Sequence, residues 1–277
     1  MNRTREFRQI DVFTDVGYLG NPLAVVVDGT DLSTEQMQQF ANWTNLSETT
    51  FLLPPTDPAA DYRVRIFTPV LELPFAGHPT IGSCRVWLDT GGTPARPDVI
   101  MQQCAAGLIS LRRDGQRLAF AAPPLRRSGP VDQQTLAQLI HALGIRPRDV
   151  VDSAWIDNGP GWVGVLLASA EQVLAVKPAF AAMDIGVVGP YPPGALHALE
   201  LRAFFPKDGV LLEDPVTGSL NASVAQWLLG SGRVRAPYIA SQGTAIGRAG
   251  RVHVEVADNE IWIGGDTVTC ISGTVIL

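Results

Sequence analysis

Residues 75–83 read FAGHPTIGS, and residues 213–219 read EDPVTGS. Both stretches hold a proline followed three residues later by Gly-Ser, at Pro79 and at Pro215, 136 positions apart in a chain of 277 residues. Each is followed by a segment of helical periodicity that contains a Trp-Leu pair. A motif that recurs at about half the length of the chain indicates a duplicated fold.

Two further matches follow the same order. Residues 20–27 (GNPLAVVV) resemble residues 158–167 (NGPGWVGVLL), and residues 106–111 (AGLISL) resemble residues 249–254 (AGRVHV). The boundary falls near 123–130, so we predict two halves of similar fold, residues 1–128 and 129–277.

The pattern of apolar residues predicts an α+β protein that is rich in strands. Short β-branched runs bounded by Gly, Pro and Asp predict strands at 9–13, 23–27, 50–53, 62–67, 108–112 and 118–120. Helical periodicity predicts helices at 34–43, 79–88, 133–143 and 215–229.

Composition narrows the class of protein. The chain is 46% hydrophobic and 17% charged, with a net charge of −6 and a pI near 5.2, so nucleic acid is not an expected partner. No apolar run reaches the roughly 20 residues that a membrane helix needs, and the N-terminus has no secretory signal pattern. The three cysteines are widely spaced and suggest neither a disulfide framework nor a zinc site. We expect a cytoplasmic protein that does not bind membranes.

The repeated prolines predict two helix starts that favour an anion. Proline is common at the first helical position, where its missing N–H costs nothing. The N-terminus of a helix presents unpaired N–H groups and about half a positive charge, which suit a carboxylate. Small residues near both starts, Gly77, Gly82 and Ser83 in one half and Thr217, Gly218 and Ser219 in the other, are expected to let a ligand approach the backbone.

Proton-transfer chemistry is predicted at the same places. His78 directly precedes Pro79 and Asp214 directly precedes Pro215, so the repeat puts them in equivalent positions. Aspartate is also a common N-cap, whereas histidine is a poor cap with an ordinary pKa near neutrality. Glu48 lies in residues 45–51 (NLSETTF), where it reads as either a surface residue or a general acid. The second role needs its pKa to rise from about 4.3 toward 6–7, which burial can cause.

Six motifs together give a family resemblance. They are DVFT at 11–14, GNP at 20–22, NLSET at 45–49, FTP at 67–69, FAGHPT at 75–80 and EDPVTGS at 213–219. In this order, and across nearly the whole chain, they resemble the phenazine-biosynthesis PhzF-like family. The resemblance implies the diaminopimelate epimerase fold: two pseudo-symmetric halves, each a mixed β-sheet barrel around a central helix, with the active site in the cleft between them.

The resemblance also implies an activity. Glu48 looks like the catalytic acid/base of the family, with His78 and Asp214 as polar partners. The substrate-binding residues are then Gly77, Gly218 and Ser219, together with the adjoining Ser47 and Thr217. The expected function is a cofactor-independent isomerase that moves a proton on a small carboxylate, similar to trans-2,3-dihydro-3-hydroxyanthranilate isomerase. No metal or organic cofactor is expected, and the default oligomer is a homodimer.

Other functions remain open at this point. A two-thiol racemase is disfavoured because neither helix start offers a cysteine, although a carboxylate/histidine epimerase stays possible. Gly-x-Gly-x-x-Gly at 159–164 matches a dinucleotide pattern, but it leads into a strand-like run rather than a helix. A catalytically silent carboxylate-binding protein would use the same helix starts.

Overall fold

The structure is a computed structural model that describes residues 3–207 and 209–277. It is α+β, as predicted, and it separates into two compact units. The first unit comprises Met1–Ala121 and Gly264–Leu277, and the second comprises Ala122–Ile263. The division therefore differs from the predicted halves 1–128 and 129–277, because the end of the chain returns to the first unit. No helix in the described ranges is long and apolar enough to cross a membrane.

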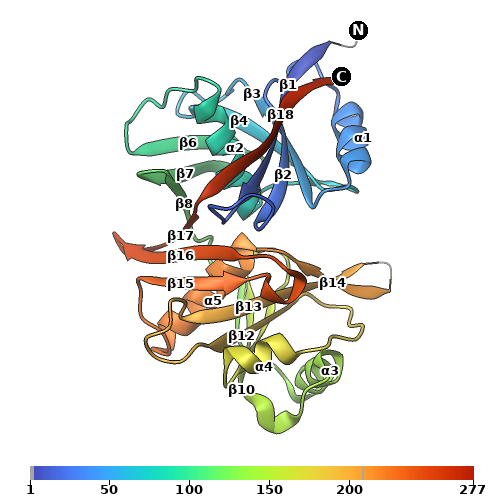
Figure 1. Cartoon of the computed structure of the whole chain (residues 1–277), viewed down its shortest axis with the longest axis vertical. Coiled ribbons are helices and arrows are strands. Elements are labelled where there is room, and N and C mark those ends of the chain that lie inside the picture. The colour runs from blue at the N-terminus through green and yellow to red at the C-terminus, as the bar shows by residue number, and fades with distance from the viewer. Residues whose placement is uncertain (1–2, 208) are drawn as a thin grey trace. The chain divides into compact units, whose positions relative to one another are not determined.

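The first unit is a mixed sheet with two helices, α1 (Thr34–Thr44) and α2 (Gly77–Asp89). In order of pairing, its strands are β18 (Thr267–Ile276), β1 (Thr4–Val12), β2 (Asn21–Val26), β3 (Glu48–Leu53), β4 (Tyr62–Phe67), β6 (Val99–Cys104), β7 (Gly107–Asp114) and β8 (Arg117–Ala121), with the short β5 (Glu72–Leu73) also on β4. The β2–β3 and β4–β6 pairs are parallel and the others antiparallel. Figure 1 shows β18 running along β1, which joins both ends of the chain to one sheet.

The α2 helix lies in the middle of this unit. It packs against β1, β2, β3, β4, β6, β8 and β18, and its residues from Gly77 to Cys84 are all buried. A Cβ atom on Gly82 would lie 2.6 Å from Cδ2 of Leu23 and 2.9 Å from Cγ2 of Val12. Gly82 therefore serves close packing of helix on sheet, and not the ligand approach expected from the sequence. Ser83 likewise bonds inward, to Oγ1 of Thr50 at 2.8 Å.

The second unit repeats this arrangement. In order of pairing, its strands are β9 (Arg127–Pro130), β10 (Val150–Asp157), β11 (Val163–Leu167), β12 (Ile185–Pro190), β13 (Leu199–Lys207), β15 (Tyr238–Gln242) and β16 (Gly250–Ala257). A short β14 (Val210–Asp214) branches from β13, and β17 (Glu260–Gly265) follows β16 in the chain. The helices are α3 (Gln133–Leu143), α4 (Ala170–Ala175) and the central α5 (Gly218–Gly230), with short 3₁₀ turns at Pro147–Asp149 and Thr244–Ile246.

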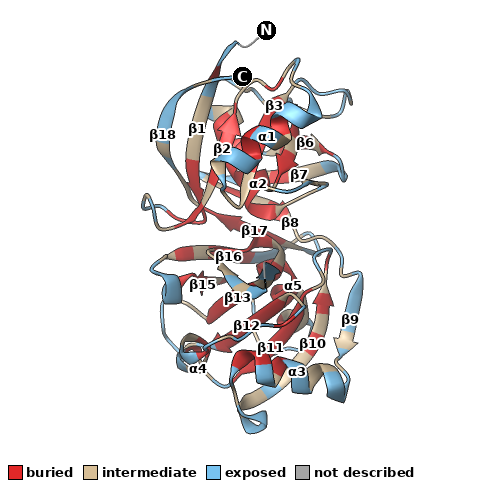
Figure 2. Ribbon diagram, turned by 90° about the vertical axis from the view of Figure 1, so that its right-hand side faces the viewer, coloured by how far each residue is buried: buried red, intermediate tan, exposed pale blue. Residues whose placement is uncertain are grey.

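The senses of pairing match between the units. Parallel β2–β3 around α1 corresponds to parallel β11–β12 around α4, and parallel β4–β6 with a branching hairpin corresponds to parallel β13–β15. Figure 2 shows buried residues concentrated on the inner strands and on the central helices, whereas α1 and α3 expose one face. The duplication inferred from the repeated motifs is thus present in the topology.

The central helices begin at different residues from those predicted. α2 starts at Gly77, two residues before Pro79, and α5 starts at Gly218, three residues after Pro215. The first residues of the two helices, Gly77 and Gly218, are therefore the structural equivalents. The predicted equivalence of His78 and Asp214 is wrong: His78 is the second residue of a helix, and Asp214 ends strand β14. The residue that corresponds to His78 is Ser219.

Candidate active site

Glu48 and His78 are brought together in the first unit. Glu48 is the first residue of β3, where it pairs with Leu23 of the parallel β2. Its Oε2 atom lies 3.2 Å from Nε2 of His78, and the two side chains are 15% and 6% exposed. Residues that are 30 positions apart in the sequence thus form one buried carboxyl–imidazole pair. Ser47, the neighbour of Glu48, lies partly exposed in the turn before β3.

Burial dominates the electrostatics of the imidazole. It lowers the pKa of His78 from 6.5 to about 3, because a charged ring would lose its solvation. The Glu48 carboxyl acts in the opposite direction, since a carboxylate at 3.2 Å favours the imidazolium form. Burial prevails, because His78 is only 5% exposed. The lowered pKa keeps His78 neutral at pH 7.

The second ring nitrogen of His78 faces the motif at residues 20–22. The amide nitrogen Nδ2 of Asn21 lies 3.4 Å from Nδ1 of His78, and Asn21 is fully buried. Asn21 begins β2 opposite Val12 of β1. The Asp11 carboxylate accepts the N–H of Gly20 at 3.1 Å, which holds the preceding turn. Nδ1 of the ring thus contacts the Asn21 amide, and Nε2 lies beside the Glu48 carboxyl.

Both central helices begin without a side-chain cap. Ser33, Asp132 and Ser169 cap α1, α3 and α4 by accepting a backbone N–H. Among the described residues, Ala76 and Thr217 give α2 and α5 no such bond. First-turn N–H groups that no side chain caps are suited to an anionic ligand. The two uncapped starts are the two that the sequence motifs predict for the site.

A buried glutamine organises the candidate residues of the second unit. Oε1 of Gln242, on β15, accepts the N–H of Thr217 at 3.0 Å and an amide hydrogen of Asn221 at 2.9 Å. Its Nε2 donates to the hydroxyl oxygen of Thr217 at 2.9 Å and to the carbonyl of Asp214 at 3.2 Å. The Thr217 hydroxyl must then donate elsewhere, and it bonds to Oδ2 of Asp214 at 2.5 Å. Asp214 and Thr217 therefore form one fixed group next to Gly218.

Ser219 is held by the residues of the second GNP-like stretch. The indole nitrogen of Trp162 donates to Oγ of Ser219 at 3.0 Å, and Nδ2 of Asn158 donates to its carbonyl oxygen at 2.9 Å. The contact of Trp162 with Ser219 corresponds in position to that of Asn21 with His78. Asn21 begins β2 and Trp162 directly precedes the matching strand β11, and each side chain contacts the second residue of the central helix of its unit.

The cysteines stand away from the helix starts. Cys84 is in the middle of α2, Cys104 ends β6, and Cys270 lies in β18. Burial raises the pKa of Cys84 to about 12, which suppresses its thiolate form. The residues in the second position of each central helix are His78 and Ser219, so a two-thiol mechanism has no support. The dinucleotide pattern at 159–164 also fails, because it leads into strand β11 instead of a helix.

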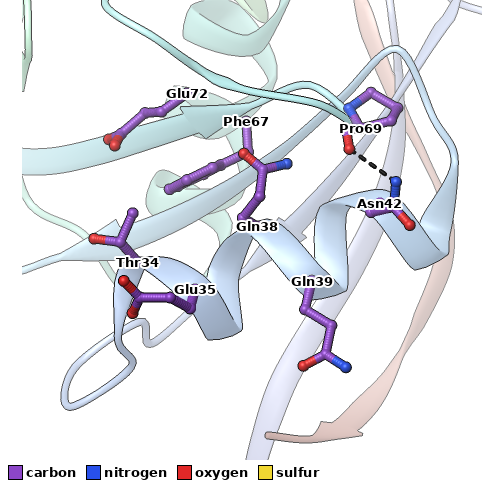
Figure 3. Close-up of a pocket in the computed structure, with 8 residues that line it drawn as sticks. All are labelled: Thr34, Glu35, Gln38, Gln39, Asn42, Phe67, Pro69 and Glu72. Atoms are coloured by element: carbon purple, nitrogen blue, oxygen red, sulfur yellow. Dashed lines mark hydrogen bonds between the residues drawn. The ribbon is translucent and has the colours of Figure 1, made fainter.

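A separate groove lies on the surface of the first unit, along α1 (Figure 3). It has a volume of about 520 Å³ and is lined by Thr34, Glu35, Gln38, Gln39, Asn42, Phe67, Pro69 and Glu72. Asn42 donates across it to the carbonyl of Pro69 at 2.9 Å. The groove contains none of the candidate site residues, and it belongs to the outer face of α1 rather than to the central helix.

Two units of matching topology, in each of which strands surround a central helix, define an epimerase-type fold. The chain belongs to the phenazine biosynthesis-like protein family, whose model matches residues 10–273.

Three relatives illustrate the similarity. The chain is 38% identical to "Antisense-enhancing sequence 1" of Schizosaccharomyces pombe, over 96% of this chain and 97% of that protein. It is 32% identical to trans-2,3-dihydro-3-hydroxyanthranilate isomerase of Pseudomonas fluorescens, over 97% and 98% of the two chains. A solved PhzF-family structure from Enterococcus faecalis superposes with a TM-score of 0.80 at 24% identity, over 99% and 100%. Several relatives are named isomerases, which supports assigning this chain to the isomerases.

Four residues that contact the candidate site were not predicted from the sequence. Asn21, Asn158 and Trp162 lie in the repeated stretches at 20–27 and 158–167, so the repeat itself is a signal that could have found them. Gln242 lies in an ordinary strand segment, 25 residues after Thr217, and its neighbours in the sequence give no such signal.

Proposed function

We propose that this protein is a cofactor-independent isomerase that shifts a proton between two carbons of a small cyclic carboxylate, with Glu48 as the acid/base. The observation that carries the proposal is the Glu48–His78 pair at the uncapped start of α2. A carboxyl group can take a proton from one carbon and return it to another without a metal or an organic cofactor. The family membership of the chain supports the same reaction type.

Neutral His78 suits a supporting role in this reaction. A neutral imidazole adds no positive charge that would hold Glu48 ionised, so the carboxyl remains free to cycle between its two forms. In a given tautomer, Nε2 of a neutral imidazole is either a donor or an acceptor. We propose that this fixed character of Nε2 orients the Glu48 carboxyl. The rise of the Glu48 pKa toward 6–7 stays a prediction, and the pH dependence of kcat measures it.

The helix starts supply the proposed binding groups. The N–H groups at Gly77 of α2, and at Gly218 and Ser219 of α5, favour negative charge on a bound ligand. Ser47, Thr217 and Asp214 are proposed as further polar contacts, with Asp214 fixed by the Thr217 hydroxyl. We propose that such a helix start holds the carboxylate of the substrate, whereas Glu48 moves the proton.

Glu48→Gln tests the proposal. The amide keeps the size of the side chain but cannot carry the proton, so turnover of trans-2,3-dihydro-3-hydroxyanthranilate should fall roughly 10²–10⁴-fold. Affinity for 3-hydroxyanthranilate, an aromatic analogue with no proton to shift, should change little. The matched control is Glu35→Gln on the outer face of α1, which should leave turnover unchanged. Full turnover by Glu48→Gln would reject the assignment.

The position of deuterium separates the competing functions. In D₂O, an isomerase leaves deuterium on a carbon other than the one that lost its proton, whereas an epimerase leaves it on the same carbon, with inversion. A binding protein incorporates none. Deuterium at the original carbon, with inversion, would replace the isomerase by an epimerase that uses the same Glu48.

A further inference from the structure

The buried imidazole of His78 has a hydrogen-bonding group on each side. Nδ1 faces the amide nitrogen of Asn21 at 3.4 Å, and Nε2 faces Oε2 of Glu48 at 3.2 Å. His78 and Asn21 are 5% and 0% exposed, so water cannot exchange freely for either partner. The ring therefore has to match its protons to these two neighbours.

The two neighbours of the ring differ in kind: the Asn21 amide nitrogen is a donor, and the Glu48 carboxylate is an acceptor. An amide nitrogen carries two hydrogens and accepts none, so Nδ1 of His78 must be the acceptor. A neutral imidazole has one N–H, which then resides on Nε2. That N–H faces the carboxylate of Glu48. Because burial keeps the ring neutral at pH 7, the choice of tautomer is the one variable that Asn21 controls.

We infer that Asn21 is a positioning residue, which holds His78 in the tautomer whose proton is on Nε2 and faces Glu48. The inference rests on the proposed role of Glu48 as acid/base. In this tautomer the positively polarised N–H of His78 lies beside the ionised Glu48, whose Oε2 atom is 3.2 Å from Nε2. Once Glu48 has taken a proton, Nε2 cannot accept it, because Nε2 already carries one. The proton is thereby returned to the substrate and not passed to the imidazole.

The second unit repeats the donor at the matching place. Trp162 precedes β11 as Asn21 begins β2, and its indole N–H, which can only donate, bonds to Ser219 at the position of His78. Two different residue types thus present a donor hydrogen at one structural position. What the units share is the direction of the hydrogen bond, which agrees with a donor role for the Asn21 amide.

Nitrogen NMR measures the tautomer directly. The chain has four histidines, and His78→Gln identifies the signals of His78 in protein labelled with ¹⁵N-histidine. At pH 7 the wild type should show an unprotonated Nδ1 and a protonated Nε2. A protonated Nδ1 in the wild type would overturn the inference, and this result needs no variant that has to fold.

Asn21→Asp replaces the hydrogen-bond donor beside Nδ1 with an acceptor. A carboxylate in place of the amide accepts a hydrogen bond, so Nδ1 of His78 should become protonated, and kcat should fall by roughly 10²-fold with KM little changed. Asn42→Asp, on the exposed face of α1, adds the same charge and should alter neither the tautomer nor kcat. An unprotonated Nδ1 in folded Asn21→Asp would overturn the inference.

The two proposals fail separately. If Glu48→Gln retains full turnover while the wild-type ring carries its proton on Nε2, the proposed function fails and the role of Asn21 as a tautomer-fixing residue stands. If Glu48→Gln is inactive while the wild-type ring carries its proton on Nδ1, the proposed function stands and the inference about Asn21 fails.

Discussion

The indole N–H of Trp162 donates a hydrogen bond of 3.0 Å to Oγ of Ser219 in the first turn of α5. An indole nitrogen cannot accept, so the serine oxygen is the acceptor and its own hydrogen points away from the tryptophan. Trp162 is only 4% exposed, which holds the donor in place. The hydroxyl of Ser219 is therefore available as a donor to a carboxylate at the helix start.

Trp162→Phe should weaken binding without affecting proton transfer. The phenyl ring keeps most of the buried apolar surface but removes the N–H, so the orientation of Ser219 is lost. A hydrogen bond contributes about 0.5–1.5 kcal/mol, which corresponds to an increase of roughly 2- to 12-fold in Kd for 3-hydroxyanthranilate. Calorimetric titration measures Kd, and kcat should stay within about twofold of the wild type.

Trp43→Phe provides the matched comparison. Trp43 is 79% exposed at the end of α1, and its ring stacks on Phe40 of the same helix. The same substitution there should leave Kd unchanged. An equal loss of affinity in both variants, or a fall in kcat alone for Trp162→Phe, would show that the bond to Ser219 has no part in binding.

The neutral state of His78 should appear in the pH dependence of stability. Burial lowers the pKa of His78 from 6.5 to about 3. Between these values the unfolded chain binds a proton that the folded chain does not, so the free energy of unfolding falls as the pH falls. The slope from this group is at most about 1.4 kcal/mol per pH unit, and it begins below about pH 6.5.

Urea unfolding at pH 7.5, 6.0 and 5.0 measures this slope. His78→Gln cannot titrate, so its free energy of unfolding should fall less steeply with decreasing pH than that of the wild type. His141→Gln, on the exposed side of α3, should leave the slope as it is. Parallel slopes for His78→Gln and the wild type would mean that His78 takes up a proton in the folded state.

The repeat in the sequence predicted the duplicated fold because each copy keeps the turn residues and the small residues that its central helix needs. It did not predict where those helices begin. Pro79 lies inside α2, whereas Pro215 lies in the turn before α5. The proline aligned the motifs, but the equivalent residues are set by the strands around each helix, and this packing is a tertiary property.

In the candidate site, too, some residues could be predicted from motifs and others only from the folded structure. Glu48, His78, Asp214 and Ser219 came from motifs, because reactive residue types stand out next to Gly and Pro. Asn21 and Gln242 act through side-chain amides that have no distinctive chemistry, and the only evidence for their roles is the direction of their hydrogen bonds. The order of the strands brings these amides to the helix starts, and no local pattern encodes that order.

Two carboxyl groups lie close together in the second unit. Burial raises the pKa of Asp184 to about 6, and the neighbouring Asp157 adds repulsion. Oδ1 of Asp157 accepts the N–H groups of Gly159 and Gly161 at 2.6 and 2.8 Å, which commits this residue to the turn before β11. The repulsion within the pair therefore appears as the raised pKa of Asp184.

Asp184→Asn should stabilise the protein at pH 8 and have little effect at pH 4.5. A raised pKa means that the folded state holds the proton more tightly than the unfolded state, so this contribution to stability is present below about pH 4 and is lost as the pH rises through about 6. The amide resembles the protonated acid at every pH. Since Asp184 is only partly buried, we expect a gain of about 1 kcal/mol at pH 8 in urea unfolding. Asp114→Asn, at the exposed end of β7, removes the same charge and should show no such difference between the two pH values. A loss of stability in Asp184→Asn at both pH values would show instead that the carboxylate is needed where it stands.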